Sequence, residues 1–385
     1  MPSFTRTALG VPASGIRRIH EIALRMDDVV ALAVGEPDQP VPAHVLEAAS
    51  AAWLADDTDY TANAGIPPLR EAIAAKLRRV NGIAVDADRV WVTAGATEAL
   101  YLALSLVLEP GDEVLVPDPG YTTFRMAPSM LSAVAVPYPL MPERGFLPDP
   151  AAIEALVSPR TRAILSNSPS NPLGVVTPEP VLRELLAVAS RHDLWLISDE
   201  VYEAFAWGER HVSPAAFDRE HRVLTVHSFS KTYALTGARV GSLVVPPGPA
   251  EVLRTYQEAI VSCVNTPAQH AALAAITGPQ DAVETAAAHY RRNLAAATAL
   301  LDGLGIRYLP PAGAFYLWID VSDRSGGDVA HFAERFLLEQ RVSVAPGSAF
   351  GDAGEGWIRI CAAASRESVL EGLRRLALMP APVPA

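Results

Sequence analysis

Short apolar runs alternate with helical patterns through the middle of the chain, and this alternation constrains the fold more than any other feature. The runs lie at 89–93, 113–116, 133–136, 162–166, 194–198, 223–227 and 241–245. Most are apolar on both faces, as buried parallel strands are, and helical patterns fall between several of them, notably over 178–191. The pattern predicts an α/β domain with a mostly parallel seven-stranded sheet between helices.

The pattern changes after residue 281. We expect a long helix over 282–304 that ends at Gly305, a strand at 314–319, a helix at 328–340, a strand at 357–361, and a last helix that begins near Arg366 with Ser365 as its N-cap. This order predicts a second, smaller α+β domain, which the irregular stretch up to Pro42 is expected to join.

Four regions follow from this organisation. Residues 1–45 are expected to be the N-terminal segment of the small domain, 46–281 the large domain, and 282–379 the small C-terminal domain. Residues 380–385 read as a frayed tail. The small domain is thus predicted to contain both ends of the chain.

Composition excludes several classes of function. The net charge of -12 argues against a nucleic-acid partner, because phosphate backbones attract basic stripes. The most apolar stretch, 99–108, is far shorter than the roughly 20 residues that a membrane span needs, so no membrane partner is expected. Cys263 and Cys361 read as ordinary core thiols, and the first ten residues show no secretion signal. We expect a cytoplasmic enzyme.

Metal and dinucleotide motifs are absent from the sequence. The nine histidines show no metal-ligand spacing and no His-Glu-x-x-His, so no metal is expected. No Gly-x-Gly-x-x-Gly follows a predicted strand, which argues against a dinucleotide.

Polar residues follow the predicted strands directly, where open α/β sheets bind their ligands. These segments are Gly95-Ala96-Thr97-Glu98, Asp118-Pro119-Gly120-Tyr121, Asn167 to Gly174, Asp199-Glu200-Val201-Tyr202 and Ser228-Phe229-Ser230-Lys231.

Lys231 stands out because the chain has only one other lysine, Lys76. Lys76 lies in an amphipathic helical pattern over 69–80 and reads as a solvated side chain. Lys231 lies in a hydroxyl-rich loop after a buried strand, where arginine could supply charge but not a nucleophilic amine. The residues alone leave two interpretations open, a Schiff-base lysine and a structural or phosphate-binding lysine.

A series of motifs resolves this choice by resemblance. The segment from Ser228 to Gly241, with Lys231 and Arg239, closely resembles the cofactor-lysine motif of the class I/II aminotransferases. The other matching motifs are Gly35-Glu36-Pro37-Asp38, Tyr60-Thr61 with Gly65 and Leu69-Arg70, Asn171-Pro172-Leu173-Gly174, Asp199-Glu200-Val201-Tyr202, Pro346-Gly347 and Arg359. The series covers nearly the whole chain in the right order. It implies the aspartate-aminotransferase fold (fold type I), with pyridoxal 5'-phosphate as cofactor.

The resemblance also implies roles around the cofactor ring. Lys231 would hold the cofactor as a Schiff base and then act as the general base. Asp199 would pair with the pyridine nitrogen, although a helix-capping Asp is the plainer alternative. Tyr202 and Asn171 would bond the 3-oxygen, and Tyr121, which could equally be ordinary packing, would stack on the ring.

Further roles concern the phosphate and the substrate. Backbone N–H groups of Ala96 and Thr97 would bind the phosphate with Ser228 and Arg239, and Ser230 would assist. Arg359, whose alternative is a surface salt bridge, would grip the substrate α-carboxylate, with Asn171 and the backbone of Gly35 beside it. Tyr60 would reach the phosphate of a neighbouring subunit, which implies a homodimer with shared active sites.

The expected reaction moves an amino group between an L-amino acid and a 2-oxo acid. One bacterial branch of aspartate aminotransferases carries a lysine where this chain has Thr97, which argues against aspartate or glutamate as the preferred donor. Arg17 reads either as a contact for the substrate side chain or as a solvent-facing residue of the first helix. A β-lyase on the same fold, and more remotely a ligand-sensing domain, are the alternatives. The sensing domain would need an added N-terminal DNA-binding segment, for which Gly35 comes too early.

Overall fold

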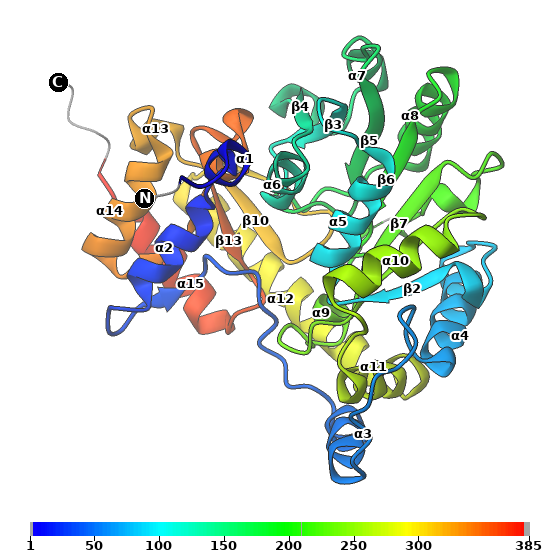
Figure 1. Ribbon diagram of the computed structural model, residues 1–385. Coiled ribbons are helices and arrows are strands. Elements are labelled where there is room, and N and C mark those ends of the chain that lie inside the picture. Colours follow the sequence, from blue (N-terminus) through cyan, green and yellow to red (C-terminus); the bar gives the residue numbers. More distant parts are fainter. Residues whose placement is uncertain (1–2, 209, 381–385) are drawn as a thin grey trace.

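A seven-stranded sheet forms the centre of the structure, a computed structural model that describes residues 3–208 and 210–380 (Figure 1). The strand order is β2-β8-β7-β6-β5-β3-β4, and β8 runs antiparallel to both of its neighbours while the other pairs are parallel. The mostly parallel sheet expected from the sequence is therefore confirmed. Its strands are β2 (Val90–Thr93), β3 (Glu113–Asp118), β4 (Val134–Pro139), β5 (Thr161–Asn167), β6 (Trp195–Asp199), β7 (Val223–Ser228) and β8 (Gly241–Val244).

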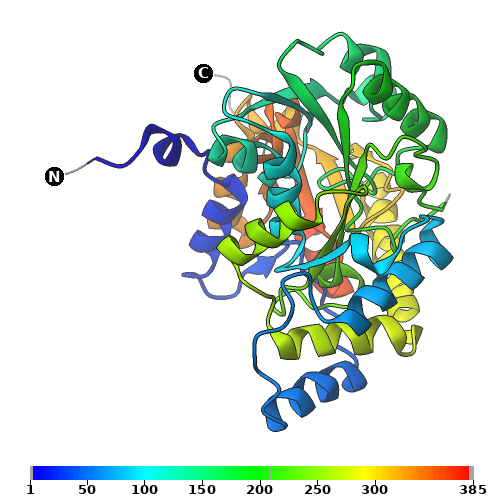
Figure 2. The same ribbon diagram turned by 45° about the vertical axis from the view of Figure 1, so that its right-hand side comes forward.

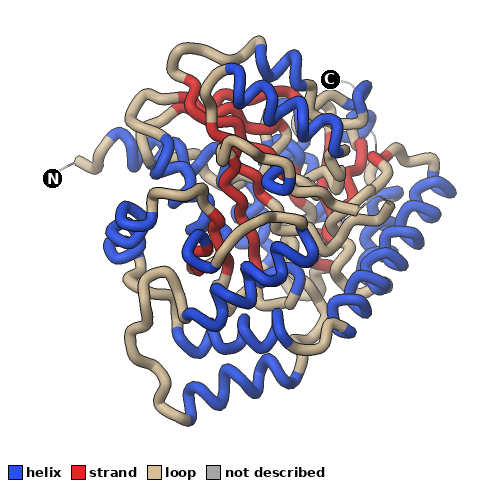
Figure 3. The backbone as a smooth tube through the Cα atoms, turned by 90° about the vertical axis from the view of Figure 1, so that its right-hand side faces the viewer, coloured by secondary structure: helices blue, strands red, loops and turns tan. Residues whose placement is uncertain are grey.

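Helices cover both faces of this sheet, because successive strand residues point to opposite sides. On β3, Val114 and Val116 pack in one core with helices α5, α6 and α10, whereas Leu115 packs in another with α7 and α8. Helices α3, α4 and α11 share a third core with β2 and β8. Figure 3 shows the strands enclosed between helices. These helices are α3 (Ala43–Leu54), α4 (Pro67–Lys76), α5 (Ala96–Val107), α6 (Thr123–Met130), α7 (Pro150–Glu154), α8 (Glu179–Arg191), α10 (Ala250–Ile260) and α11 (Thr266–Thr277).

A smaller α+β part is built from both ends of the chain, as expected. Its four-stranded sheet has the order β12-β13-β10-β9, and the N-terminal strand β1 pairs in parallel with β11. Leu32 from the N-terminal segment is fully buried in the same core as Phe332 and Leu373. The elements are β1 (Val30–Ala31), α12 (Asp281–Leu304), β9 (Tyr308–Leu309), β10 (Tyr316–Asp320), α13 (Ser322–Ser325), α14 (Val329–Gln340), β11 (Val342–Ser343), β12 (Ala345–Pro346), β13 (Trp357–Cys361) and α15 (Arg366–Ala377).

Two caps fix helix ends where the sequence places them. Gly305 adopts a left-handed conformation with φ of 66° and ends α12, while the Ser365 side chain accepts from the Ser368 N–H and starts α15. The domain boundaries at 45/46 and 281/282 stay predictions. Of the tail at 380–385, residues 381–385 lie outside the described part of the chain.

The expectation of an irregular stretch up to Pro42 is wrong. Two helices form there, α1 (Arg6–Gly10) and α2 (Gly15–Ala23), each opened by a hydroxyl N-cap, Thr5 and Ser14. α1 is short and buries no residue, so it carries no apolar pattern. On α2, however, Ile16, Ile19 and Ile22 recur at helical spacing and pack against the cores, a periodic signal that the prediction overlooked. The N-terminal segment with α1 projects from the body of the molecule in Figure 2.

The interpretation of Lys76 as a solvated side chain is also wrong. Lys76 ends α4, and its ammonium forms an ion pair with Glu203 in a site where the lysine side chain is only 20% exposed. A π-helical turn, Leu77–Asn81, continues α4 beyond this residue. The helical pattern over 69–80 could not show which face of the helix meets Glu203.

Both cysteines are free, with Cys361 buried and Cys263 half-buried. No helix within the described residues combines the length and apolar character that crossing a bilayer requires.

Candidate active site

A cavity of about 290 Å³ opens at the carboxyl ends of the parallel strands, close to the lower end of the roughly 300–1,000 Å³ typical of ligand sites. The small part of the molecule closes it from the other side. Twelve residues singled out from the sequence line this cavity: Gly35, Ala96, Thr97, Tyr121, Asn171, Asp199, Tyr202, Ser228, Ser230, Lys231, Arg239 and Arg359. Segments far apart in the sequence therefore meet in one place, although the roles assigned to these residues stay predictions.

Lys231 reaches the cavity from α9 (Phe229–Thr232), a single turn directly after β7. The Ser228 side chain caps this turn by accepting from the Ser230 N–H at 3.1 Å. The Lys231 ammonium donates to the Gly35 carbonyl oxygen at 2.6 Å, and no carboxylate among the described residues forms an ion pair with it. Burial lowers the pKa of Lys231 to about 8, although Cys361 and Glu36 oppose the shift. The site thus holds an amine that gives up its proton near neutral pH.

Asp199 ends β6 and is buried in the same cavity. Its Oδ1 accepts from the Val201 N–H at 3.2 Å, and the Asn167 side chain donates to its backbone carbonyl at 3.1 Å. Burial raises the pKa of Asp199 to about 7. A cation in the cavity would keep this carboxylate ionised, and a protonated nitrogen of a cofactor ring would be such a cation.

The beginning of α5 forms a cradle for an anion. Gly95 precedes the helix with φ of 79° and provides no side-chain cap, which leaves the N–H groups of Ala96 and Thr97 at the helix start. A Cβ at Gly95 would collide with the Arg239 guanidinium, and a Cβ at Gly241 would lie 2.7 Å from the Ala96 nitrogen. Gly95 thus lets a guanidinium approach the helix N-terminus, and Gly241 lets β8 pass close to it. The resulting donor set fits a phosphate group.

Hydrogen bonds fix the residues expected to surround the cofactor ring. The hydroxyls of Tyr202 and Tyr316 lie 2.6 Å apart, and burial raises the pKa of Tyr202 well above its usual value. The Asn171 N–H donates to the Asn167 side chain at 2.8 Å. Tyr121 meets Phe124 edge-to-face and lines the cavity. These contacts hold three hydrogen-bonding or aromatic groups in place before any ligand arrives.

Arg359 is an arginine without an acidic partner. Its side chain is 2% exposed, which rules out the surface salt bridge considered from the sequence. It donates to the Asn171 side chain at 2.7 Å and to the Ala33 carbonyl, and it lies over the Tyr316 ring at 4.3 Å. Its buried Nε has no hydrogen-bond partner within residues 3–208 and 210–380. A buried guanidinium with a free donor is suited to a ligand carboxylate.

The structure adds residues that sequence reasoning missed. Tyr316 lines the cavity from β10, where its apolar neighbours make it read as a core residue. It also explains Gly35, because a Cβ there would overlap the Tyr316 hydroxyl. Asn167 belongs to a quoted strand end but carries no role in the sequence argument. An amide side chain at the end of a predicted buried strand was the sequence signal that could have identified it.

Arg17 and Tyr60 differ from the rest. Arg17 is an exposed residue of α2 that also lines the cavity, and its role stays a prediction. Tyr60 is 88% exposed and is not among the residues that line the cavity. Within one chain, its phenol has no part in the site.

Comparison with known proteins agrees with this geometry. The family model for aminotransferase class I and II matches residues 27–376. The chain is 39% identical to the aspartate/prephenate aminotransferase of Thermus thermophilus over 91% of this chain and 90% of the relative. It is 38% identical to the arginine–pyruvate transaminase of Pseudomonas aeruginosa over 92% and 91%.

A solved structure of Thermus thermophilus aspartate aminotransferase with maleate superimposes with a TM-score of 0.94 at 36% identity, covering 99% of this chain and all of that one. Together, the family match, the relatives and the shared fold place this chain, a transaminase, in the class I and II aminotransferase family.

Proposed function

We propose that the cavity binds pyridoxal 5'-phosphate through Lys231 and transfers an amino group between an L-amino acid and a 2-oxo acid. The observation that carries this proposal is the Lys231 amine, which lies in one cavity with Asp199 and with the unpaired donor of Arg359. When bound, the cofactor ring supplies an electron sink for the carbanion formed at the α-carbon of the amino acid.

Each end of the cavity offers a different chemistry. Asp199 would hold a proton on the ring nitrogen, because a buried carboxylate is stabilised by a neighbouring cation. The cradle at Ala96 and Thr97, with Ser228 and Arg239, would bind the phosphate. Tyr202 keeps its proton and can donate to a ring oxygen, as can the Asn171 amide.

Lys231 would then move the reacting proton. Burial lowers the pKa of Lys231 to about 8, so a larger share of this amine is neutral at pH 7 than of an exposed lysine. Its Nζ can therefore accept a proton from the substrate α-carbon at neutral pH. Arg359 would orient that carbon by binding the carboxylate next to it.

We further propose that a second copy of the chain completes the site. Exposed apolar side chains gather around α3, including Leu46, Trp53 and Leu54. Leu46 and Trp53 line a hollow of about 570 Å³ that Arg239 also lines, so this surface adjoins the phosphate end of the cavity. Exposed apolar patches of this kind mark protein–protein contacts. Tyr60, which follows α3, would then reach the phosphate of the neighbouring subunit.

The amino donor is a separate question. The relatives named for aspartate/prephenate and for arginine–pyruvate are about equally similar to this chain, so their printed names do not select a substrate. We infer that the wall formed by Arg17 and His20 on α2 and by Thr97 contacts the substrate side chain. A screen of amino acids with a common oxo acid tests this, since variants at Arg17 should change the order of preference.

Replacing Lys231 by arginine tests the central role. The variant keeps a positive charge but has no amine that can react or accept a proton, so we expect amino transfer to fall by at least about a thousandfold. The measurement is oxo-acid formation from an amino acid with and without an added oxo-acid acceptor. Activity within tenfold of the original protein would contradict the proposal. If the original protein forms pyruvate and ammonia without an acceptor, the β-lyase alternative is indicated instead.

Replacing Arg359 by methionine tests substrate orientation. Loss of a buried charge partner costs about 2–5 kcal/mol, so kcat/KM for an amino acid should fall at least about 30-fold. A primary amine without a carboxylate serves as the control, because its slow reaction should change little. Equal losses for both compounds would show that Arg359 supports the fold rather than binding the carboxylate.

Mixing two impaired variants tests the shared site. Lys231→Ala dimers lack the amine, and Tyr60→Ala dimers should bind the cofactor weakly. A hybrid dimer has one site with both residues intact, so random mixing should restore about a quarter of the original activity at low cofactor concentration. No recovery, in a mixture shown by mass spectrometry to contain hybrids, would place Tyr60 outside the partner's site.

A further inference from the structure

A charged network lies behind the cavity, on the far side of the turn that carries Lys231. Lys76 and Asn81 both donate to the Glu203 carboxylate, and His227 Nδ1 faces the same carboxylate at 3.4 Å. The His227 side chain is 8% exposed, and its Nε2 contacts the Thr225 hydroxyl at 3.1 Å. None of these groups has a part in the proposed chemistry.

The network joins the two turns that carry the cavity's reactive groups. Glu203 directly follows Tyr202 and comes four residues after Asp199. His227 directly precedes Ser228 and comes four residues before Lys231. A second cavity of about 110 Å³ contains the network, and Ser228 lines both cavities. The contact between Glu203 and His227 therefore ties the two turns together from behind.

We propose that Lys76 is a positioning residue that, through Glu203 and His227, holds the turns bearing Asp199 and Lys231 at the spacing that the cofactor needs. This inference rests on the proposed binding of pyridoxal 5'-phosphate at Lys231. It gives both lysines of the chain a place at one site, one on each side of the same turn.

Electrostatics explains why a cation is needed at this position. Asp199, Glu200 and Glu203 are three carboxylates within five residues, all of them shielded from water. Burial would raise the pKa of Glu203, but Lys76 and His227 outweigh it and hold the pKa well below its usual value. Without Lys76, Glu203 would have to take up a proton or move toward water, and the turn with Asp199 would move with it.

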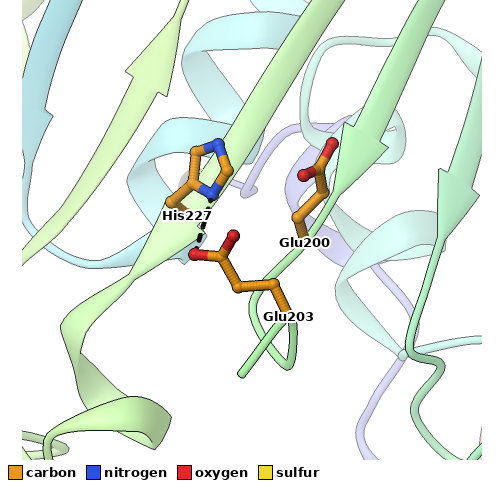
Figure 4. Close-up of side chains that lie close together, drawn as sticks. All are labelled: Glu200, Glu203 and His227. Atoms are coloured by element: carbon orange, nitrogen blue, oxygen red, sulfur yellow. Dashed lines mark ion pairs between the residues drawn. The ribbon is translucent and has the colours of Figure 1, made fainter. Parts of the chain in front are cut away.

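A metal ion is the competing explanation, since ligand atoms of Glu200, Glu203 and His227 lie within 4.8 Å of one another. In Figure 4, however, the Glu200 carboxylate is turned away from the Glu203 carboxylate, and the ion pair drawn joins only His227 and Glu203. Both carboxylate oxygens of Glu200 are already bonded, one to the hydroxyls of Ser198 and Ser213 and the other to His211 at 3.0 Å. The Lys76 ammonium already pairs with Glu203 Oε1, the same oxygen that faces His227. The geometry favours an internal ion pair.

Titration of cofactor-free protein with pyridoxal 5'-phosphate tests the proposal without relying on activity. Lys76→Met should weaken binding about tenfold, the lower end of the range for outer-shell partners of bound metals. Lys76→Arg, which restores the charge, should stay within about threefold of the original protein. Arg79→Met removes an exposed charge from the next helical turn and should change nothing. Equal affinities for Lys76→Met and the original protein would overturn the proposal.

Two further variants separate positioning from general stability. Leu337→Ala, in the buried core around α14, should lower the unfolding midpoint without changing cofactor affinity. The double variant Lys76→Met/Glu203→Gln should bind more tightly than Lys76→Met alone, because it removes the unpaired carboxylate. If all destabilised variants lose affinity in proportion to their stability, the network has only a structural role.

The original protein provides the remaining controls. If it shows no covalent cofactor at Lys231, the proposed function fails, whatever the Lys76 variants do. If it binds the cofactor there but Lys76→Met binds equally well, only the network fails. One tightly held metal ion per chain, lost in Glu203→Gln, would replace the ion-pair interpretation.

Discussion

A lysine amine that is removed from water holds its proton less tightly. The structure around Lys231 keeps this amine buried, and the rest of the proposed site depends on that burial. The turn that carries the lysine is a single helical turn between a buried strand and a loop, so it cannot bury an amine by itself. The parallel sheet supplies one wall, and the N-terminal segment supplies the Gly35 carbonyl that accepts from the amine. The site therefore needs both ends of the chain in place.

The charged groups on the two sides of this turn differ in how they are paired. In the cavity, neither the Lys231 amine nor the Asp199 carboxylate forms an ion pair within the described chain, and the Arg359 Nε has no hydrogen-bond partner there, which is a cost in free energy that a ligand can offset. Behind the turn, the Glu203 carboxylate accepts from Lys76 and Asn81 and faces His227. A paired carboxylate behind a cavity that still has free charged groups helps to preorganise a binding site.

Periodicity in the sequence predicts the sheet well, because strands such as β3 are buried on both faces and read as continuous apolar runs. Capping residues add to it, since Gly305 predicts the end of α12 and Ser365 the start of α15. Periodicity gives no signal at α1, which buries no residue, and the prediction of an irregular stretch overlooked the helical spacing of Ile16, Ile19 and Ile22 in α2. It also fails for contacts made at a distance: the pairing of Lys76 with Glu203, and the position of Tyr316 against Gly35, depend on how elements pack rather than on local pattern. The role proposed for Tyr60 requires a second chain, which no local pattern can show.

The most direct test of this account is to reduce the cofactor-loaded protein with borohydride and to map the labelled residue by mass spectrometry. The chain has two lysines, so the experiment has an internal control. We predict one pyridoxyl group per chain on Lys231 and none on Lys76. A label on Lys76, or no label on protein that has been saturated with pyridoxal 5'-phosphate, would contradict the account.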